Sequence, residues 1–288
     1  MLLQDDNLMA KKTFSPPKTN IMKRHFFLIT GLVLSLALCM VSCKKEKINI
    51  GNQPAGDSEP AGDSEPAGDG IIKNAVKDYD GNTYDAVKLG TQVWMASNLR
   101  TTHYADGTEI DEGTTTNFHH AYRYATNGDF ATYGYLYNWP AVSRGANSSE
   151  ANPSGMQGIC PNGWHLPSDA EWDQLTEYCM SKDEYVCGEY LRDYANALAA
   201  NRDWTTSDKE CSPGYDLSSN NSTGFGAVPA GTYPGVDVLT GKYAYFWGAT
   251  GCDGCTYSYT HYISNNDKKM YRLPYDKNTG LSVRCVRD

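Results

Sequence analysis

The chain has 288 residues and a formal net charge of −9 at pH 7, which argues against a nucleic-acid-binding protein with a broad basic face. Aromatic residues make up 12% of the sequence, including 21 tyrosines and 6 tryptophans, and there are 27 glycines. This composition favours a loop-rich fold built on strands over a helical bundle.

The first predicted element is a targeting segment at residues 22–42. Met22 to His25 is a short basic stretch, and Phe26 to Val41 is an apolar run, shorter than the roughly 20 residues that span a bilayer. Ser42-Cys43 after this run resembles a bacterial lipobox, in which the cysteine is acylated. An ordinary signal peptide and a buried helix are the alternatives. Residues 1–21 are predicted to be an upstream leader.

Residues 43–70 are predicted to be a disordered acidic tether. Ala55 to Pro60 is repeated as Ala61 to Pro66, and Gly, Ser, Pro and acidic residues cannot build a core. Acylation of Cys43 would attach this tether to a lipid bilayer, because several acyl chains together anchor a protein stably. The folded domain is therefore predicted at residues 71–288.

The folded part begins with turn signals between apolar segments. Asp80-Gly81 predicts one hairpin, and Gly90-Thr91 predicts a second hairpin within Ala86 to Met95. Asp106-Gly107 predicts a further turn. Tyr133 to Trp139 alternates aromatic residues and predicts a strand.

Two helices are predicted in the middle of the chain. Ser168 is a good N-cap, and Glu171 three residues later completes a capping box, so a helix should run to about Ser181. Apolar residues recur at helical spacing from Val186 to Ala200 and predict the second helix.

The last third of the chain reads as strands and turns. Gly224 to Gly231 is a tight segment punctuated by glycines, and Tyr243 to Trp247 is predicted to be a buried strand. Ser282 to Arg287 alternates apolar and polar residues and predicts a closing strand. Because Val286 falls on the face opposite Val283, this strand is expected to be covered on both faces.

Several motifs in a fixed order resemble one protein family. They are Asp80 to Tyr84, Gln92 to Leu99, Gly134 to Trp139, Cys160 to Leu175, Gly224 to Gly231, Phe246-Trp247 and Ser282 to Asp288. In combination they look like the Fibrobacter succinogenes major paralogous domain, over about residues 74–288. The resemblance implies secreted or lipid-anchored bacterial proteins with no established common activity.

Leu166 to Trp172 and the closing Val283 to Asp288 are also similar to the formylglycine-generating and sulfatase-modifying group. This likeness implies an α+β, C-type-lectin-like fold: irregular antiparallel sheets with two helices and long loops. The chain lacks the Glu-Pro-Asn or Gln-Pro-Asp triplet of sugar-binding C-type lectins, and the reactive cysteine pair of the formylglycine enzymes cannot be placed. Neither the calcium-sugar site nor the oxidase chemistry is therefore expected.

The cysteines predict disulfides. Nine cysteines less Cys39 and Cys43 leave seven, so at least one stays free or pairs between molecules. Cys252-Asp253-Gly254-Cys255 could be a redox or metal site, and a small structural disulfide is the favoured interpretation. A lectin-like fold brings its two ends together, which implies a Cys160–Cys285 disulfide. The pairing of Cys179, Cys187 and Cys211 is left open.

Neither a catalytic residue, a cofactor nor a metal ion is predicted. There is no Gly-x-Ser-x-Gly or Walker A motif. His119-His120 is the best metal candidate, but neighbouring residues on a strand point to opposite faces. Glu109, Asp111 and Glu112 suit a solvated turn better than a calcium loop, and His165 is expected to be structural. Five tryptophans are expected in the core: Trp94, Trp139, Trp164, Trp172 and Trp247.

The late tyrosines are the candidate ligand contacts, because a tyrosine ring joins a flat apolar face to a polar edge. They are Tyr243, Tyr245, Tyr257, Tyr259 and Tyr262, in the region that forms the ligand-binding end of a C-type-lectin-like fold. The predicted function is a lipid-anchored binding module of the bacterial cell envelope, at the outer membrane, for a glycan or protein ligand. The alternatives are a carbohydrate-active or thiol-oxidising enzyme, and a structural envelope or fimbria-associated subunit.

Overall fold

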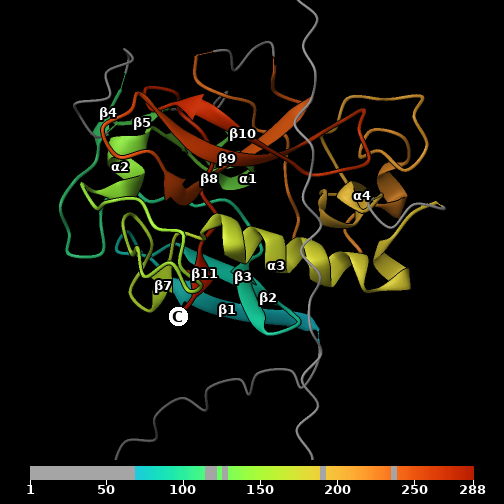
Figure 1. Ribbon diagram of the computed structural model, residues 1–288, viewed down its shortest axis with the longest axis horizontal. Coiled ribbons are helices and arrows are strands. Elements are labelled where there is room, and N and C mark those ends of the chain that lie inside the picture. Colours follow the sequence, from blue (N-terminus) through green and yellow to red (C-terminus); the bar gives the residue numbers. More distant parts are fainter. Residues whose placement is uncertain (1–68, 114–121, 125–128, 189–192, 235–238) are drawn as a thin grey trace, which may run out of the picture. The chain divides into compact units, whose positions relative to one another are not determined.

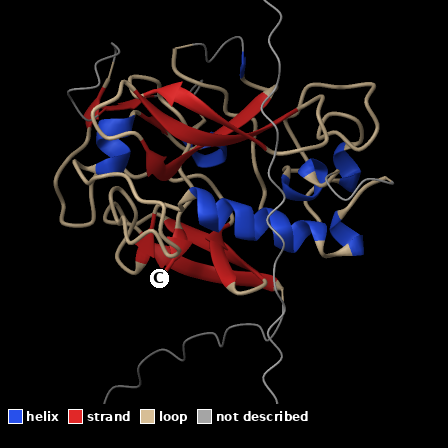
Figure 2. Ribbon diagram, viewed as in Figure 1, coloured by secondary structure: helices blue, strands red, loops and turns tan. Residues whose placement is uncertain are grey.

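The computed structural model describes residues 69–113, 122–124, 129–188, 193–234 and 239–288 (Figure 1). The predicted leader, targeting segment and Cys43 lie outside these ranges, as does the tether up to residue 68. The described helices are α1 Phe130–Tyr133, α2 Trp139–Ser143, α3 Asp169–Met180 and α4 Ala195–Leu198, with short 3-10 helices at Asp183–Tyr185 and Leu217–Ser219. The described strands are β1 Gly70–Lys77, β2 Thr83–Leu89, β3 Gln92–Met95, β4 Asp111–Glu112, β5 Tyr122–Tyr124, β6 Leu136–Tyr137, β7 Trp164–His165, β8 Tyr243–Gly251, β9 Tyr257–Ser264, β10 Tyr271–Asp276 and β11 Val286–Arg287. The fold is α+β, as predicted, with mostly antiparallel sheets and long loops (Figure 2).

The first sheet has five strands in the order β1-β2-β3-β11-β7. Both predicted hairpins are confirmed: β1 pairs with β2 around Asp80-Gly81, and β2 pairs with β3 around Gly90-Thr91. The two turns need the left-handed backbone that glycine tolerates, with φ of +85° at Gly81 and +63° at Gly90. The last strand, β11, therefore lies between strands from the start and the middle of the domain.

A second sheet has the order β10-β9-β8, and a third, smaller sheet has the order β4-β5-β6. β8 confirms the predicted strand at Tyr243 to Trp247 and extends it to Gly251. The β8–β9–β10 sheet is antiparallel throughout, and its register places Tyr245 opposite Tyr262 and Tyr262 opposite Tyr271.

Helix α3 lies between the first and second sheets (Figure 1). Its predicted capping box is present, because the Ser168 hydroxyl accepts from the Glu171 backbone N–H and the Glu171 carboxylate accepts from that of Ser168. Trp172 and Leu175 are buried on its inner face, in a core that both sheets share. The helix therefore covers the inner face of the second sheet, where it packs against Ala244, Phe246 and Ile263.

The prediction of a second helix over Val186 to Ala200 is wrong. Val186 is extended, Gly188 has φ of +84°, and a disulfide joins Cys187 to Cys211. Only Ala195–Leu198 is helical among the described residues of this stretch. A crosslink and a left-handed glycine stop the helix that the apolar spacing suggested.

The predicted strand at Tyr133 to Trp139 is also largely wrong, since only Leu136 and Tyr137 pair as a strand there, β6. Gly134 ends α1 with φ of +73°. Asn138 is the N-cap of α2, its side chain accepting from the backbone N–H of Ala141, and Pro140 occupies the first turn of the helix.

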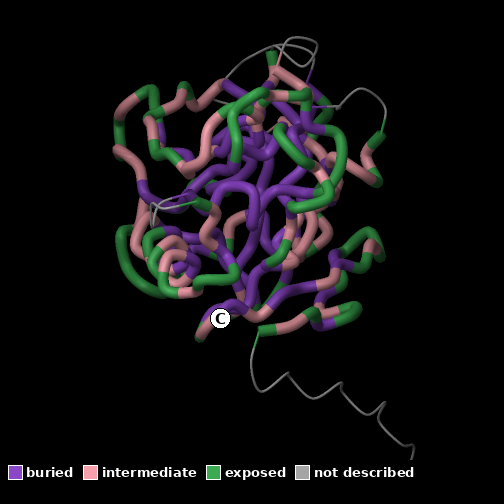
Figure 3. Tube along the Cα trace, turned by 90° about the vertical axis from the view of Figure 1, so that its right-hand side faces the viewer, coloured by how far each residue is buried: buried purple, intermediate pink, exposed green. Residues whose placement is uncertain are grey.

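The closing strand is shorter than predicted, because only Val286–Arg287 is extended with strand pairing. Both of its faces are covered as expected: Val283 and Cys285 pack into one core cluster and Val286 into another. Buried chain runs through the middle of the domain and exposed loops surround it (Figure 3). The five family-motif tryptophans are all buried, which confirms their predicted place in the core.

Arg284 is fully buried, and its hydrogen-bonding partners are neutral carbonyl oxygens and not a carboxylate. Its guanidinium donates to the Asn98 side chain at 2.8 Å and to the backbone carbonyls of Met95, Phe225 and Gly226 at 2.5–3.0 Å. The predicted glycine-punctuated segment is confirmed here, since left-handed glycines turn the chain so that these carbonyls face the cation.

Among the residues that the structure describes, we find no helix with the length and apolar character needed to cross a bilayer.

Candidate functional site

Five tyrosines lie on one face of the β8–β9–β10 sheet. Alternation along the strands and the pairing register place them there together with Leu273 and several hydroxyl residues. We call them the tyrosine surface: Tyr243, Tyr245, Tyr262, Tyr271 and Tyr275. Three of the five were predicted candidates, and β10, which the sequence did not resolve as a strand, supplies the other two.

The rings of the tyrosine surface form a continuous contact network. Ring centroids are 5.4 Å apart for Tyr243 and Tyr245, 5.0 Å for Tyr245 and Tyr262, and 5.5 Å for Tyr262 and Tyr271. Tyr275 lies 5.3 Å from Tyr245. Tyr245 is only 8% exposed and Tyr271 is 37% exposed, so the surface has a buried centre and an accessible edge.

The other two predicted candidates, Tyr257 and Tyr259, lie on the opposite face of β9. They contact each other at 6.0 Å, and the Arg272 guanidinium lies over the Tyr259 ring. Successive residues of a strand point to opposite faces, so Tyr257 and Tyr259 lie on one face of β9 and Tyr262 on the other. This alternation could have been read from the sequence alone.

The tyrosine surface carries no charged residue on this face of its three strands. The residues that share this face with the tyrosines are Trp247, Ser258, Thr260, Ser264 and Leu273. Burial raises the pKa of Tyr262 and Tyr271, so these phenols stay neutral and can both donate and accept. In the described part of the chain the hydroxyls of Tyr243 and Tyr262 have no hydrogen-bonding partner. The face therefore offers apolar rings, and the hydroxyls of Tyr243 and Tyr262 are its free polar edges.

The predicted disulfides are present. Cys160 and Cys285 are joined with their Cα atoms 6.0 Å apart, and Cys252 is joined to Cys255. Cys179 is the free thiol of the described cysteines; it is buried, and burial raises its pKa to about 12. A thiol of this kind is a poor nucleophile.

The metal candidates that the structure describes do not assemble into a site. Within the described ranges there is no group of three or more His, Cys, Asp or Glu residues able to hold an ion. Asp111 and Glu112 are exposed, as the predicted solvated turn requires, but they form strand β4 and not a turn. His119 and His120 lie outside the described residues.

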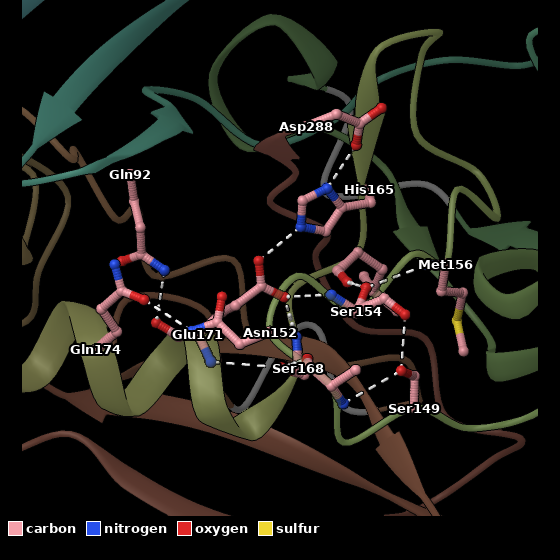
Figure 4. Close-up of polar contacts among 12 residues, drawn as sticks. Gln92, Ser149, Asn152, Ser154, Met156, His165, Ser168, Glu171, Gln174 and Asp288 are labelled. Atoms are coloured by element: carbon pink, nitrogen blue, oxygen red, sulfur yellow. Dashed lines mark hydrogen bonds and ion pairs between the residues drawn. The ribbon is translucent and has the colours of Figure 1, made fainter.

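His165 is the centre of a buried polar cluster (Figure 4). Its Nε2 lies 2.6 Å from Glu171 Oε1, and its Nδ1 lies 2.6 Å from Asp288 Oδ1. The other oxygen of Glu171 accepts from the backbone N–H groups of Ser154 and Ser168. The cluster joins α3, β7 and the last residues of the domain, which agrees with the predicted structural role.

A family model described as the Fibrobacter succinogenes major domain matches residues 87–287. The chain belongs to this family. No curated protein and no solved structure matches the chain. The resemblance found in the sequence is thus confirmed at the level of the family, and the C-type-lectin-like likeness stays a prediction.

The motifs of this Fibrobacter succinogenes major domain form its core. Trp94 and Trp172 contact each other at 4.6 Å, and Phe225 and Phe246 pack against Trp172 at 6.1 and 5.7 Å. The tyrosine surface lies outside these motifs. Family membership therefore explains the shared core, and the surface has to be interpreted from its own chemistry.

Proposed function

We propose that this domain is a binding module, anchored to a membrane of the bacterial cell envelope through Cys43, and that its tyrosine surface binds a neutral glycan. The observation that carries the proposal is the gathering of five tyrosines on one uncharged sheet face. The lipobox-like sequence and the tether support the location. An outer-membrane position is part of this proposal.

A neutral glycan fits this surface better than a charged partner. The C–H faces of a sugar ring can pack on phenol rings, and its hydroxyls can pair with the free edges of Tyr243 and Tyr262. A charged macromolecule would gain no opposite charge from this face of the strands. A protein partner remains the competing outcome of the test.

The test is retention of the full chain on insoluble neutral polysaccharides such as cellulose, xylan and mannan. Wild type should be retained by at least one of them. Tyr243→Ala and Tyr271→Ala should each weaken retention by about 2- to 10-fold, because an aromatic contact contributes roughly 0.5–1.5 kcal/mol.

Tyr257→Ala is the matched control. Tyr257 is 37% exposed, as is Tyr271, but it lies on the opposite face of the sheet. Retention should be unchanged in this variant. The proposal is wrong if wild type binds no neutral polysaccharide, or if Tyr257→Ala loses as much retention as Tyr271→Ala.

A further inference from the structure

A groove of about 490 Å³ lies beside α3, near the edge of the second sheet. This volume falls within the range of small-ligand sites. One wall is a face of α3 and the other is the chain that leads into β10, with His261 of β9 between them. The lining residues are Asp173, Thr176, Glu177, Met180, Tyr194, His261, Lys269, Met270, Tyr271 and Arg272.

The two walls of this groove carry opposite charge and do not neutralise each other. Asp173 and Glu177 are exposed and line the groove from α3, and Lys269 and Arg272 line it from the segment that leads into and begins β10. In the described part of the chain no ion pair joins the two acids to these two bases. Arg272 instead donates from Nε to Asp169, at the start of α3.

In this arrangement one N–H group of the Arg272 guanidinium is bonded, and its other N–H groups are available to a ligand. Its Nε donates to Asp169, and its Cζ lies 3.4 Å from the ring centroid of Tyr259. Its terminal nitrogens have no hydrogen-bonding partner among the described residues. A guanidinium fixed in this way is preorganised to receive a carboxylate with its remaining N–H groups.

The residue between the walls adds an unusual polar group. His261 is 4% exposed and stacks on Trp172 with ring centroids 5.0 Å apart. Its Nδ1 has no hydrogen-bonding partner in the described structure, and neither has the buried Oδ1 of Asp169. Burial lowers the pKa of His261 to about 3, so the ring is neutral. Asp169 Oδ1 lies 3.8 Å from His261 Nε2, beyond hydrogen-bonding distance, and buried polar atoms without hydrogen-bonding partners are rare in native proteins.

We propose that this groove binds a free apolar α-amino acid in its zwitterionic form. The ligand carboxylate pairs with Lys269 and Arg272, and its ammonium pairs with Asp173 and Glu177. Met180 and Met270 supply an adaptable apolar lining for the side chain. The site is separate from the tyrosine surface, although Tyr271 borders both.

The test is calorimetric titration of the full chain with L-leucine, compared with N-acetyl-L-leucine and L-leucinamide. The first analogue lacks the ammonium group and the second lacks the carboxylate. L-leucine should bind saturably, and each analogue should bind at least about tenfold more weakly, because hydrogen bonds to charged groups are among the strong ones.

Charge reversals then assign the two ends of the ligand. Glu177→Lys and Lys269→Glu should each weaken L-leucine binding at least about tenfold, and the double variant should regain part of the loss because the walls have exchanged sign. Glu184→Lys and Lys77→Glu, at exposed positions that do not line the groove, should change affinity less than about twofold.

The absence of saturable L-leucine binding would overturn the proposal, as would a blocked analogue that binds as tightly as L-leucine or equal losses in the control variants. Tyr243→Ala should leave L-leucine binding unchanged. Failure at the groove and failure at the tyrosine surface are therefore separate results.

Discussion

His165 has a carboxylate at each of its ring nitrogens, both at 2.6 Å. A neutral imidazole has only one N–H and could donate to only one of them, so the geometry favours the doubly protonated ring. Burial acts to lower the pKa of His165, but the hydrogen bonds and charges of Glu171 and Asp288 outweigh it, and the net pKa is raised.

This raised pKa predicts a pH-dependent stability. The unfolded histidine has a pKa near 6.5, so the stabilisation from His165 is complete below that pH and is lost as the pH rises through the raised folded value. Urea unfolding of wild type and His165→Gln should differ most at and below pH 6, and the difference should shrink as the pH rises above 6.5. A difference in unfolding free energy that stays constant with pH would contradict the prediction.

His261 provides a control of opposite sign. Its folded pKa is lowered to about 3, so its contribution is present above pH 6.5 and is lost as the pH falls towards 3. His261→Gln should therefore alter the slope of stability with pH below 6.5 and leave the slope above 6.5 in place.

At the scale of elements, the Cys160–Cys285 disulfide crosslinks the residue before β11 to the turn before β7 across 125 positions of sequence. Loop-closure entropy gives such a bond about 4–5 kcal/mol. Replacing both cysteines by alanine should lower the unfolding free energy by that order, measured by denaturant titration under non-reducing conditions.

The Cys252–Cys255 bond is the matched comparison, because it spans only 3 positions. The same relation gives about 1–2 kcal/mol for a loop of that length. Equal losses of unfolding free energy in the two double variants would show that the long crosslink does not stabilise the domain through loop-closure entropy.

Local signals made several elements predictable and left others out of reach. The capping box at Ser168 and Glu171 and the glycine turn at Gly81 act within a few residues, and both are present in the structure. The helix expected after Val186 failed because the Cys187 crosslink reaches Cys211, a contact that apolar spacing does not encode. Gly188 was the local sign against it.

The candidate site was predictable only in part for the same reason. Tyr243, Tyr245 and Tyr262 were found by composition, but their grouping with Tyr271 depends on how β9 pairs with β10. Strand register is a long-range property, set by the packing of a whole face. The groove beside α3 depends on the same pairing, which brings Arg272 next to His261.

For the whole molecule, we predict that membrane attachment depends on Cys43. The Cys43→Ala chain should incorporate no labelled palmitate and should either be released in soluble form or accumulate as an uncleaved precursor, because the acyl chains that would hold it are missing. Cys39→Ala is the control, and it should be labelled as wild type is. Persistent labelling of Cys43→Ala would exclude this anchor.

The position of β11 in the first sheet sets the point in synthesis at which the domain can complete its fold. Residues 285–288 supply the strand between β3 and β7, one half of the long crosslink and a carboxylate for His165. A nascent chain that has not yet delivered these residues lacks the strand that joins β3 to β7, so the domain cannot complete its fold from the N-terminal side during synthesis. Such a chain stays open in this sheet until residues 285–288 have emerged and paired.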